Sequence, residues 1–355
     1  MKILFVQEYF YPVITGGSEI YSYILVKELL RLGHEVFVIG GGFSNKFEKV
    51  EDIPIQRVDL MPSRFLFNIK SIFTIKKILK KFDADLIHGN TFHASIPAGL
   101  VGHFNRIPNL ISVHNLFLYT WKLYFDPIRS ALFYVFERFE FSMPYDKIIA
   151  SDHNSFRNLK LLGLEKKSTY IPYPIRTDVF YPKKRKGDKI VIGAAGRFYD
   201  PSKGFGVLTD LINEYKNRKD IEFLFVGPYS PKQKNKLKKF KNVKLVGKVQ
   251  YSQMPKFYNM MDIFIGQTIA AKEAMACGCV SILDHEESKL WYYHKPELES
   301  KAFLSGNVPE LVREFIDNKK KRKIQSRKGI EFIKKNYSLN VVVNKTLDVY
   351  KEITK

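Results

Sequence analysis

The chain contains few of the residues that would cross-link a small fold or span a bilayer. Only 2 of its 355 residues are cysteine, Cys277 and Cys279, and this close pair excludes a disulfide framework and a zinc site. No uninterrupted apolar run approaches the roughly 20 residues that a membrane-spanning helix needs. The N-terminus turns polar at Gln7 and Glu8, too early for the apolar region of a secretory signal. We therefore expect a cytoplasmic protein, either free or bound peripherally to the inner face of the membrane.

Acidic residues are scarce beside basic ones. Asp and Glu number 36 and Lys and Arg number 58, which gives a formal net charge of +22. This excess indicates a polyanionic partner: phosphorylated ligands, an anionic membrane surface or nucleic acid. The chain carries no helix-turn-helix, zinc-finger or aromatic ribonucleoprotein signature, so we expect no nucleic-acid partner. Hydrophobic residues make up 45% of the chain, enough to build ordinary globular cores.

Short apolar strands alternate with helical patterns in two separate stretches. The first begins with residues 2–7, continues through a helix opened by Gly16-Gly17, and reaches another strand at 35–39. The pattern restarts near residue 188, after a segment rich in proline and lysine. Such alternation predicts parallel sheets joined by right-handed crossovers.

We therefore predict an α/β protein in which two Rossmann-like parallel-sheet domains face each other across a cleft. The predicted N-terminal domain comprises residues 1–180, and the predicted C-terminal domain comprises residues 181–335. Residues 336–355 are predicted to form a helix that packs back on the N-terminal domain.

The stretch from Gly196 to Gly204 is the most informative part of the chain. In it, Arg197 and Lys203 flank a glycine-bearing turn between the apolar run 190–195 and a helical pattern from Phe205. Open α/β sheets bind ligands at the carboxyl ends of their strands, and a helix N-terminus favours anions there. The two cations therefore suit a diphosphate. In isolation, such a pair would as well be a solvated arginine and lysine on a surface turn.

Other motifs accompany this stretch in a fixed order over nearly the whole chain. They are Tyr9-Phe10-Tyr11-Pro12, Gly16-Gly17-Ser18-Glu19, Leu29 to Val38, Phe225-Val226-Gly227, Leu245-Val246-Gly247, Met261-Asp262-Ile263-Phe264 and Glu273 to Gly278. The ordered set resembles the retaining glycosyltransferases of family 4, group 1 glycosyltransferases that have the GT-B fold.

This resemblance implies roles for three residues of the C-terminal domain. Arg197 and Lys203 would be catalytic, because they would hold the donor pyrophosphate and stabilise its growing charge as it leaves. Removing one such preorganised hydrogen-bonding group typically lowers the reaction rate by ~10²- to 10³-fold. Glu273 would accept hydrogen bonds from the nucleotide ribose, since a carboxylate can take both hydroxyls. A solvated glutamate at a helix end is the alternative for Glu273.

The resemblance also implies roles for residues elsewhere. Gly16 and Gly17 would let backbone amides approach the donor phosphates, and an ordinary strand-to-helix turn capped by a serine is the alternative. His114 would contact the transferred sugar, and a satisfied core histidine is its alternative. Gly227 belongs to a donor-binding motif, and Val249 stands where a backbone contact to the base is expected.

The chain departs from the family pattern just before Glu273. Family members usually carry a second carboxylate eight residues earlier, where this chain has Ile265. The stretch from Asp262 to Glu273 is also about half a dozen residues shorter than usual. Gln267 and Thr268 occupy the gap and would offer neutral hydrogen bonds to the donor sugar. Either the sugar pocket is rebuilt, or the protein binds a nucleotide without efficient transfer.

The function implied by the resemblance is metal-independent, retaining transfer of a sugar from a UDP- or GDP-linked donor. The acceptor would be a hydroxyl of a lipid-linked or cell-surface glycan, and no cofactor is expected. The resemblance also implies that the N-terminal domain holds the acceptor and the C-terminal domain holds the donor. The alternative is a nucleotide-binding pseudo-glycosyltransferase that serves as the partner subunit of another transferase.

A basic and apolar stretch indicates a further contact. From Ser63 to Phe82, isoleucines and phenylalanines interleave with lysines at helical spacing, which is the composition of a membrane-surface helix. Lysines near an anionic leaflet contribute ~1 kcal/mol each, and aromatic residues recur at 117–125. The alternative is a helix that covers the sheet with its apolar face and exposes its lysines to water.

Overall fold

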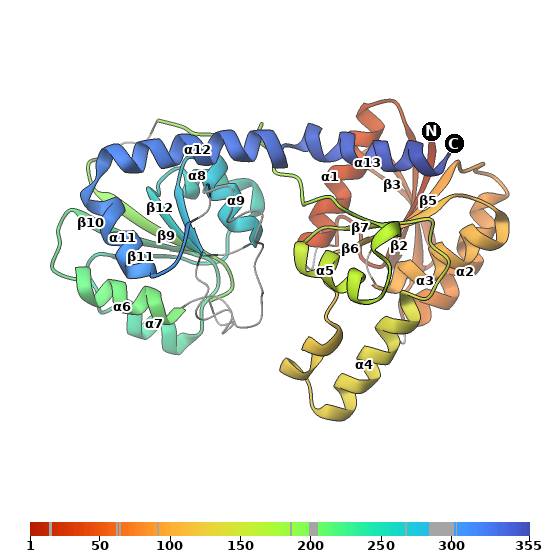
Figure 1. The fold of residues 1–355 in the computed structure, drawn as a ribbon, viewed down its shortest axis with the longest axis horizontal. Coiled ribbons are helices and arrows are strands. Elements are labelled where there is room, and N and C mark those ends of the chain that lie inside the picture. The colour runs from red at the N-terminus through yellow and green to blue at the C-terminus, as the bar shows by residue number, and fades with distance from the viewer. Residues whose placement is uncertain are drawn as a thin grey trace. The chain divides into compact units, whose positions relative to one another are not determined.

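The structure of the protein is a computed structural model. It describes residues 1–13, 16–61, 63, 65–90, 92–184, 187–198, 205–266, 268–283, 302 and 304–355. The chain divides into two compact units (Figure 1). Unit 1 comprises Met1–Tyr173 together with Val342–Lys355, and unit 2 comprises Pro174–Val341. The sequence places this boundary at residue 180, a few residues beyond the division after Tyr173.

Unit 1 contains an eight-stranded sheet in the order β3-β4-β2-β1-β5-β6-β7-β8. Its strands are β1 (Lys2–Gln7), β2 (Glu35–Gly42), β3 (Lys46–Val50), β4 (Ile53–Asp59), β5 (Leu86–Asn90), β6 (Asn109–Val113), β7 (Lys147–Ala150) and β8 (Ser168–Tyr170). All neighbours are parallel except the edge strand β3, which runs antiparallel to β4. The strand order reverses between β1 and β5, and open α/β sheets bind ligands at the carboxyl ends beside such a reversal.

Helices flank this sheet and bury their apolar sides against it. They are α1 (Gly17–Arg31), α2 (Leu66–Leu79), α3 (Phe92–Asn105), η1 (Leu118–Leu123), α4 (Pro127–Glu140), α5 (His153–Leu161), η2 (Glu165–Lys167) and the last helix, α13 (Leu339–Ile353). Strand β1 is a continuous apolar run whose Ile3, Leu4, Phe5 and Val6 are fully buried, as expected of a central parallel strand covered on both faces. Helix α13 lies against this unit, where a 2.6 Å hydrogen bond joins the Tyr350 hydroxyl and His88 Nδ1.

Unit 2 contains a six-stranded parallel sheet in the order β11-β10-β9-β12-β13-β14. Its strands are β9 (Ile190–Ala195), β10 (Ile221–Val226), β11 (Val243–Val246), β12 (Ile263–Gly266), β13 (Val280–Leu283) and β14 (Leu304–Ser305). Numbered along the chain, this is the order 3-2-1-4-5-6 of a dinucleotide-binding sheet, with its reversal between β9 and β12.

Helices cover both faces of the second sheet, and each face has its own core. The helices are α6 (Phe205–Tyr215), α7 (Pro231–Leu237), η4 (Tyr251–Gln253), α8 (Met254–Tyr258), α9 (Thr268–Ala276), α11 (Val308–Asp317) and α12 (Lys319–Tyr337). Tyr258, Phe264 and Met275 belong to one core, and Leu211 and Phe315 belong to the other. The predicted class, α/β with two Rossmann-like parallel-sheet domains, is confirmed. The cleft predicted between the domains stays a prediction.

Within the described part of the chain, no helix has both the length and the apolar character needed to cross a membrane.

Candidate functional site

Unit 2 contains a cavity of about 360 Å³ at the carboxyl ends of β9, β10, β11 and β12. It therefore lies beside the reversal in strand order, where the sheet topology places a ligand. Four of the residues predicted from the sequence line it: Arg197, Gly227, Val249 and Glu273. These residues come from segments up to 76 positions apart in the chain, and the fold brings them to one cavity.

Two backbone segments meet closely at this cavity. Gly196 N donates to Val226 O at 3.0 Å, and Phe198 N donates to Pro228 O at 2.9 Å. A Cβ on Gly227 would lie 2.0 Å from the Gly196 carbonyl oxygen, and the φ of Gly227 is 136°. Only glycine fits such a contact and such a backbone conformation. The close packing of the two segments holds the backbone of Arg197 at the cavity.

Arg197 directly follows this contact, and its side chain is exposed at the cavity. No acidic side chain in the described part of the chain pairs with its guanidinium. Lys203 and Gln267 lie outside the described residues. Thr268 is described only as the first residue of α9.

Glu273 is 3% exposed and is held by two tyrosines. Its Oε1 accepts a 2.6 Å hydrogen bond from the Tyr251 hydroxyl, and its Oε2 accepts a 3.0 Å bond from the Tyr258 hydroxyl. Burial raises the pKa of Glu273 to about 7, and the two tyrosine hydroxyls oppose that rise. Glu273 is therefore a desolvated carboxyl at the cavity wall rather than a solvated helix-terminal glutamate.

The connection before Glu273 is as short as the sequence indicated. Strand β12 ends at Gly266 and helix α9 begins at Thr268. Ile265 is 2% exposed and lines the same cavity, so an apolar side chain stands at the position where the family usually has a carboxylate. This part of the wall can exclude water, but its side chain offers no hydrogen bond to a sugar.

In unit 1, Gly16 and Gly17 form the beginning of α1. Gly16 is the N-cap residue, and Gly17 is the first helical residue. The cap is made by Glu19, whose carboxylate accepts hydrogen bonds from Gly16 N and from the Ser18 hydroxyl. From the sequence, Ser18 was the alternative capping residue. In the structure, the Glu19 side chain caps the helix instead. Whether these glycines meet donor phosphates stays a prediction.

His114 follows β6 and is 7% exposed, with both ring nitrogens engaged inside unit 1. Asn90 Nδ2 donates to Ser22 Oγ at 2.6 Å, which orients the amide so that Asn90 Oδ1 accepts from His114 Nε2 at 2.7 Å. His114 Nδ1 lies 2.8 Å from Ser151 Oγ. Burial lowers the pKa of His114 to about 3, so the ring is neutral. This environment is that of a satisfied core histidine, and the contact with a sugar stays a prediction.

A second cavity, of about 330 Å³, lies in unit 1 and was not predicted from the sequence. Its walls are mostly aromatic, and its polar groups are Glu8, His93 and Glu137; the aromatic residues are Phe65, Trp121, Phe133 and Phe136. His93 Nε2 lies 3.9 Å from Glu8 Oε2. Glu8 directly follows β1 and His93 closely follows β5, so this cavity adjoins the strand-order reversal of the first sheet. The sequence signal that could have indicated this cavity was a glutamate, Glu8, directly after a buried strand.

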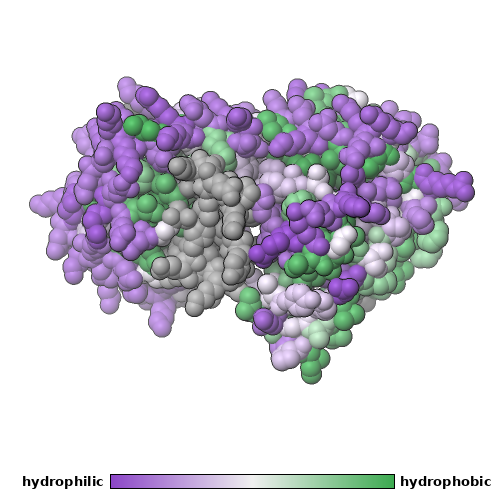
Figure 2. Space-filling view, viewed as in Figure 1, coloured by the Kyte–Doolittle hydropathy of each residue, from purple (hydrophilic) through white to green (hydrophobic). Residues whose placement is uncertain are grey.

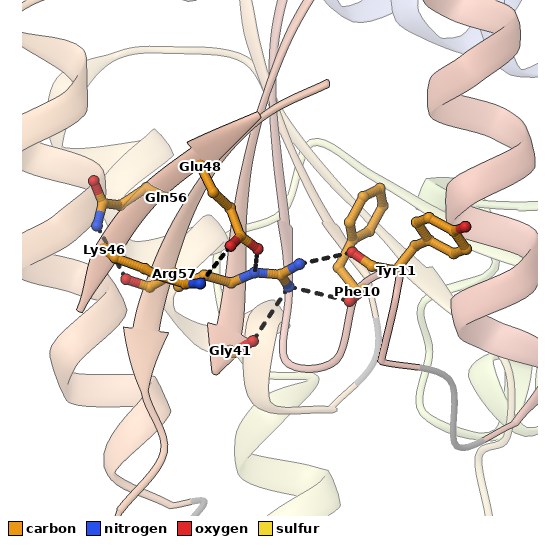
Figure 3. Close-up of polar contacts among 7 residues, drawn as sticks. All are labelled: Phe10, Tyr11, Gly41, Lys46, Glu48, Gln56 and Arg57. Carbon is orange, nitrogen blue, oxygen red and sulfur yellow. Dashed lines mark hydrogen bonds and ion pairs between the residues drawn. The ribbon is translucent and has the colours of Figure 1, made fainter. Parts of the chain in front are cut away.

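The loop between β1 and Gly16 is held by a buried arginine of β4 (Figure 3). Arg57 is 3% exposed. Its guanidinium donates to Tyr11 O at 2.7 Å, to Phe10 O at 3.1 Å and to Gly41 O at 3.3 Å, and its Nε donates to Glu48 Oε1 at 2.7 Å. One side chain thus fixes the backbone of the loop that leads to the predicted phosphate-facing glycines.

Comparison with known proteins places the whole arrangement in a family. The model of Glycosyltransferase Family 4 matches residues 15–179, and the model of Glycosyl transferases group 1 matches residues 189–286. The two models match successive parts of one chain, in the order in which the two sheets occur. The chain therefore belongs to the group 1 glycosyltransferases of family 4, and its fold is GT-B.

Solved structures of low sequence identity share this fold. The chain is similar to sucrose-phosphate synthase from Thermosynechococcus elongatus, with a TM-score of 0.73, 17% identity and coverage of 99% and 98% of the two chains. A glycosyltransferase from Rickettsia africae gives a TM-score of 0.71, 19% identity and coverage of 100% and 98%. The Anabaena protein HepE, in complex with UDP and glucose, gives a TM-score of 0.69, 14% identity and coverage of 99% and 100%.

One curated relative resembles a short part of the chain. It is the UDP-N-acetylglucosamine--N-acetylmuramyl-(pentapeptide) pyrophosphoryl-undecaprenol N-acetylglucosamine transferase of Clostridium botulinum. It is 31% identical over 106 residues, which cover 26% of this chain and 30% of that protein.

Proposed function

We propose that the protein is a metal-independent, retaining glycosyltransferase that uses a UDP- or GDP-linked sugar. The acceptor is a hydroxyl of a lipid-linked or cell-surface glycan. The observation that carries this proposal is the cavity at the reversal in strand order of unit 2, which Arg197, Gly227, Val249 and Glu273 line together. The UDP in the HepE structure and the UDP-sugar in the name of the Clostridium relative support a nucleotide-sugar donor.

Each of the four cavity residues has a role in binding the sugar nucleotide. The Arg197 guanidinium faces the diphosphate, and the close contact between Gly196 and Gly227 lets that diphosphate approach the backbone. The Glu273 carboxylate accepts from the ribose hydroxyls, and the backbone at Val249 meets the base. A cavity of about 360 Å³ falls in the ordinary range for small-molecule sites. Lys203 supplies the second positive charge that the proposal places beside the diphosphate.

In the reaction, the bond between the anomeric carbon and the diphosphate oxygen breaks. The acceptor oxygen forms a new bond to that carbon on the face that the diphosphate leaves, and the acceptor proton passes to the departing phosphate. Negative charge grows on the diphosphate during this step, so fixed cations stabilise the transition state more than the ground state. Arg197 and Lys203 thereby perform the charge neutralisation that a metal ion would otherwise supply.

A second candidate function follows from the wall of the same cavity. Ile265 replaces a carboxylate, and the connection from β12 to α9 is short, while Arg197 and Glu273 are present. This combination favours a nucleotide-binding protein without efficient transfer, which would act as the partner subunit of another transferase. Such a protein would bind a nucleoside diphosphate and leave every acceptor unmodified.

The test measures donor binding and donor turnover separately. Calorimetry with UDP and GDP reports binding, and release of the diphosphate from UDP- and GDP-sugars reports turnover. We expect Arg197→Ala to lower turnover by about 10²-fold or more. Arg218→Ala removes an exposed arginine of the same unit that pairs with Asp220, and should leave turnover unchanged. Equal turnover in the Arg197 variant and the wild type would refute the assigned role, and binding without any turnover would favour the second candidate.

The proposal includes a location at the inner face of the membrane, where lipid-linked acceptors are available. The net charge of +22 supports attraction to an anionic leaflet. Vesicle binding by the purified protein tests this part.

A further inference from the structure

Helix α4 exposes a line of large apolar side chains along one side. Ile128, Leu132, Val135 and Phe139 are 75%, 66%, 63% and 54% exposed. Their spacing of four, three and four residues places them on a single helical stripe. We call these four residues the α4 face. The exposed Tyr119 and Phe125 of the preceding segment pack on Tyr134 and Phe133, which lie on other sides of the helix.

The α4 face belongs to a well-ordered element rather than to a frayed one. Helix α4 begins at Pro127, and the Asp126 carboxylate caps it by accepting from Ile128 N and Arg129 N. The opposite side of the helix packs inward, where the Phe133 ring stacks on Trp121 at 4.8 Å. Figure 1 shows α4 extending beyond the rest of unit 1. The stripe therefore belongs to a capped and packed helix, and contiguous apolar patches exposed to solvent mark interaction sites.

The charges on this element favour an anionic partner. The two acidic residues of α4, Glu137 and Glu140, point inward and are 0% and 1% exposed. Glu137 is used to hold η1, because its carboxylate accepts from Phe117 N and Leu118 N. The basic residues of the helix, Arg129 and Arg138, are exposed, and so is Lys122 of η1. Arg129 pairs with the exposed Asp126 at 3.4 Å, so Arg138 and Lys122 carry the excess positive charge of this element. In Figure 2, hydrophobic and pale side chains gather where α4 lies in Figure 1, while the coloured part of unit 2 on this face is mostly hydrophilic.

We propose that the α4 face docks on an anionic lipid surface, an inference that rests on the proposed function at the membrane. An apolar stripe beside exposed arginines is the composition of helices that lie in the membrane interface. A second copy of this chain is a poorer partner for the face, since each copy carries a charge of +22 and like charges repel at close range.

Helix α2, the membrane helix predicted from the sequence, is less suited to this task. It buries Phe67, Ser71 and Ile75 against unit 1, as the alternative interpretation required. Only Ile69 and Phe73 of the helix are large, apolar and exposed. The Lys70 ammonium donates to Asp59 O and Met61 O, so this lysine is occupied within the protein.

Docking by the α4 face would bring the aromatic cavity of unit 1 to the membrane. Helix α4 and η1 supply Trp121, Phe133, Phe136 and Glu137 to that cavity. An acceptor whose lipid remains in the leaflet would therefore meet the carboxyl edge of the first sheet without leaving the bilayer. This arrangement assigns the recognition of the lipid surface to one helix and leaves the glycan to the cavity.

The experiment measures co-sedimentation of the full chain with vesicles, in the absence of donor. The vesicles contain either phosphatidylcholine alone or phosphatidylcholine mixed with phosphatidylglycerol. We expect the double variant Leu132→Gln, Val135→Gln to bind the mixed vesicles at least ~10-fold more weakly, because two exposed apolar side chains no longer enter the interface. The control Phe43→Gln, Phe104→Gln removes side chains that are 87% and 77% exposed elsewhere on unit 1, and should bind as the wild type does.

Further measurements make each outcome decisive. The thermal midpoint and the affinity for UDP should be the same in the α4 variant and the wild type, so that lost vesicle binding reflects the surface alone. Equal vesicle binding by the α4 variant and the control would overturn the proposal. So would wild-type binding that is the same with and without phosphatidylglycerol. A change of sedimentation coefficient in the α4 variant, with unchanged vesicle binding, would assign the face to a second copy. Absence of donor turnover with intact vesicle binding would count against the proposed function only.

Discussion

The Tyr251 hydroxyl donates a 2.6 Å hydrogen bond to Glu273 Oε1 in the cavity of unit 2. Tyr251 is 40% exposed, whereas Tyr258, the second donor to this carboxyl, is 1% exposed. The ribose of a bound nucleotide is proposed to use the same carboxylate. Tyr251 has solvent on one side and can turn away, while Tyr258 is enclosed. We therefore predict that the Tyr251 hydroxyl occupies the position of one ribose hydroxyl until the nucleotide binds.

The first prediction removes this competitor. Tyr251→Phe should bind UDP or GDP about 5-fold more tightly at a pH where Glu273 is ionised, because no hydrogen bond has to be broken before the ribose binds. Calorimetry gives the affinity. Tyr229→Phe, a change to a tyrosine packed on the far core of the same unit, is the control. Weaker binding by the Tyr251 variant would mean that its hydroxyl contacts the nucleotide directly.

The second prediction concerns pH. Burial raises the pKa of Glu273 to about 7, above the ordinary 4.5 of a glutamate. Between these two values the folded chain holds a proton that the unfolded chain has lost, so the free energy of unfolding should fall as the pH rises through this window and level off above it. Denaturant unfolding across the window measures this slope, which reaches at most about 1.4 kcal/mol per pH unit for one group.

The variant Glu273→Gln tests this assignment, since the amide has the same shape and does not titrate. Its unfolding profile should lack the slope of the wild type over the same window. Nucleotide affinity of the wild type should rise as Glu273 ionises, and the variant should lack that component of the rise. A wild-type slope that survives in the variant would assign the titration to another group.

The third prediction concerns the close backbone contact in the donor cavity. Gly227→Ala places a Cβ 2.0 Å from the Gly196 carbonyl at a φ of 136°, so the two segments must separate. We expect a loss of about 2 kcal/mol or more in unfolding free energy and a marked loss of nucleotide affinity. Gly247→Ala is the matched control, because a Cβ there has nothing within 4 Å. Similar behaviour of both variants would contradict the importance of this contact.

The fourth prediction concerns the arginine that holds the loop before Gly16. Arg57→Met leaves the Tyr11 carbonyl without its guanidinium donor, removes one of two donors to Phe10 O and removes one of two cations beside Glu48. We expect the unfolding free energy to fall by about 3 kcal/mol. Arg129→Met is the control, because this arginine pairs with Asp126 at the surface of the same unit and the two side chains are 70% and 50% exposed, where ion pairs contribute less than about 1 kcal/mol. Equal losses would show that Arg57 is no more than a surface contact.

Much of the fold was accessible from the sequence because its signals are local. The predicted strand 2–7 and the apolar run 190–195 coincide with β1 and β9, and the predicted strand 35–39 lies within β2. Apolar runs of this length, between glycines and helical patterns, are typical of buried parallel strands. Strand β3 was missed, since it is a polar edge strand whose only sheet partner is β4, and its residues carry no apolar run.

The candidate site was accessible only in part. Arg197, Gly227, Val249 and Glu273 were found through motifs, and the fold gathers them at one cavity. The two tyrosines on Glu273 were not found, because η4 and α8 contact α9 through the fold and not through any spacing in the chain. The same holds for His93 beside Glu8, since the meeting of β1 and β5 sets their distance.

The sequence by itself determined the class of the fold, the strand-helix alternation and the segments that carry the family motifs. All of these depend on short-range periodicity and on residues whose backbone preferences are local. Only the tertiary structure decided which apolar sides are covered. Helix α4 is apolar on two sides, and periodicity alone cannot tell the side that packs on Trp121 from the side that faces water. Long-range packing makes that choice, and it also sets the desolvation of Glu273.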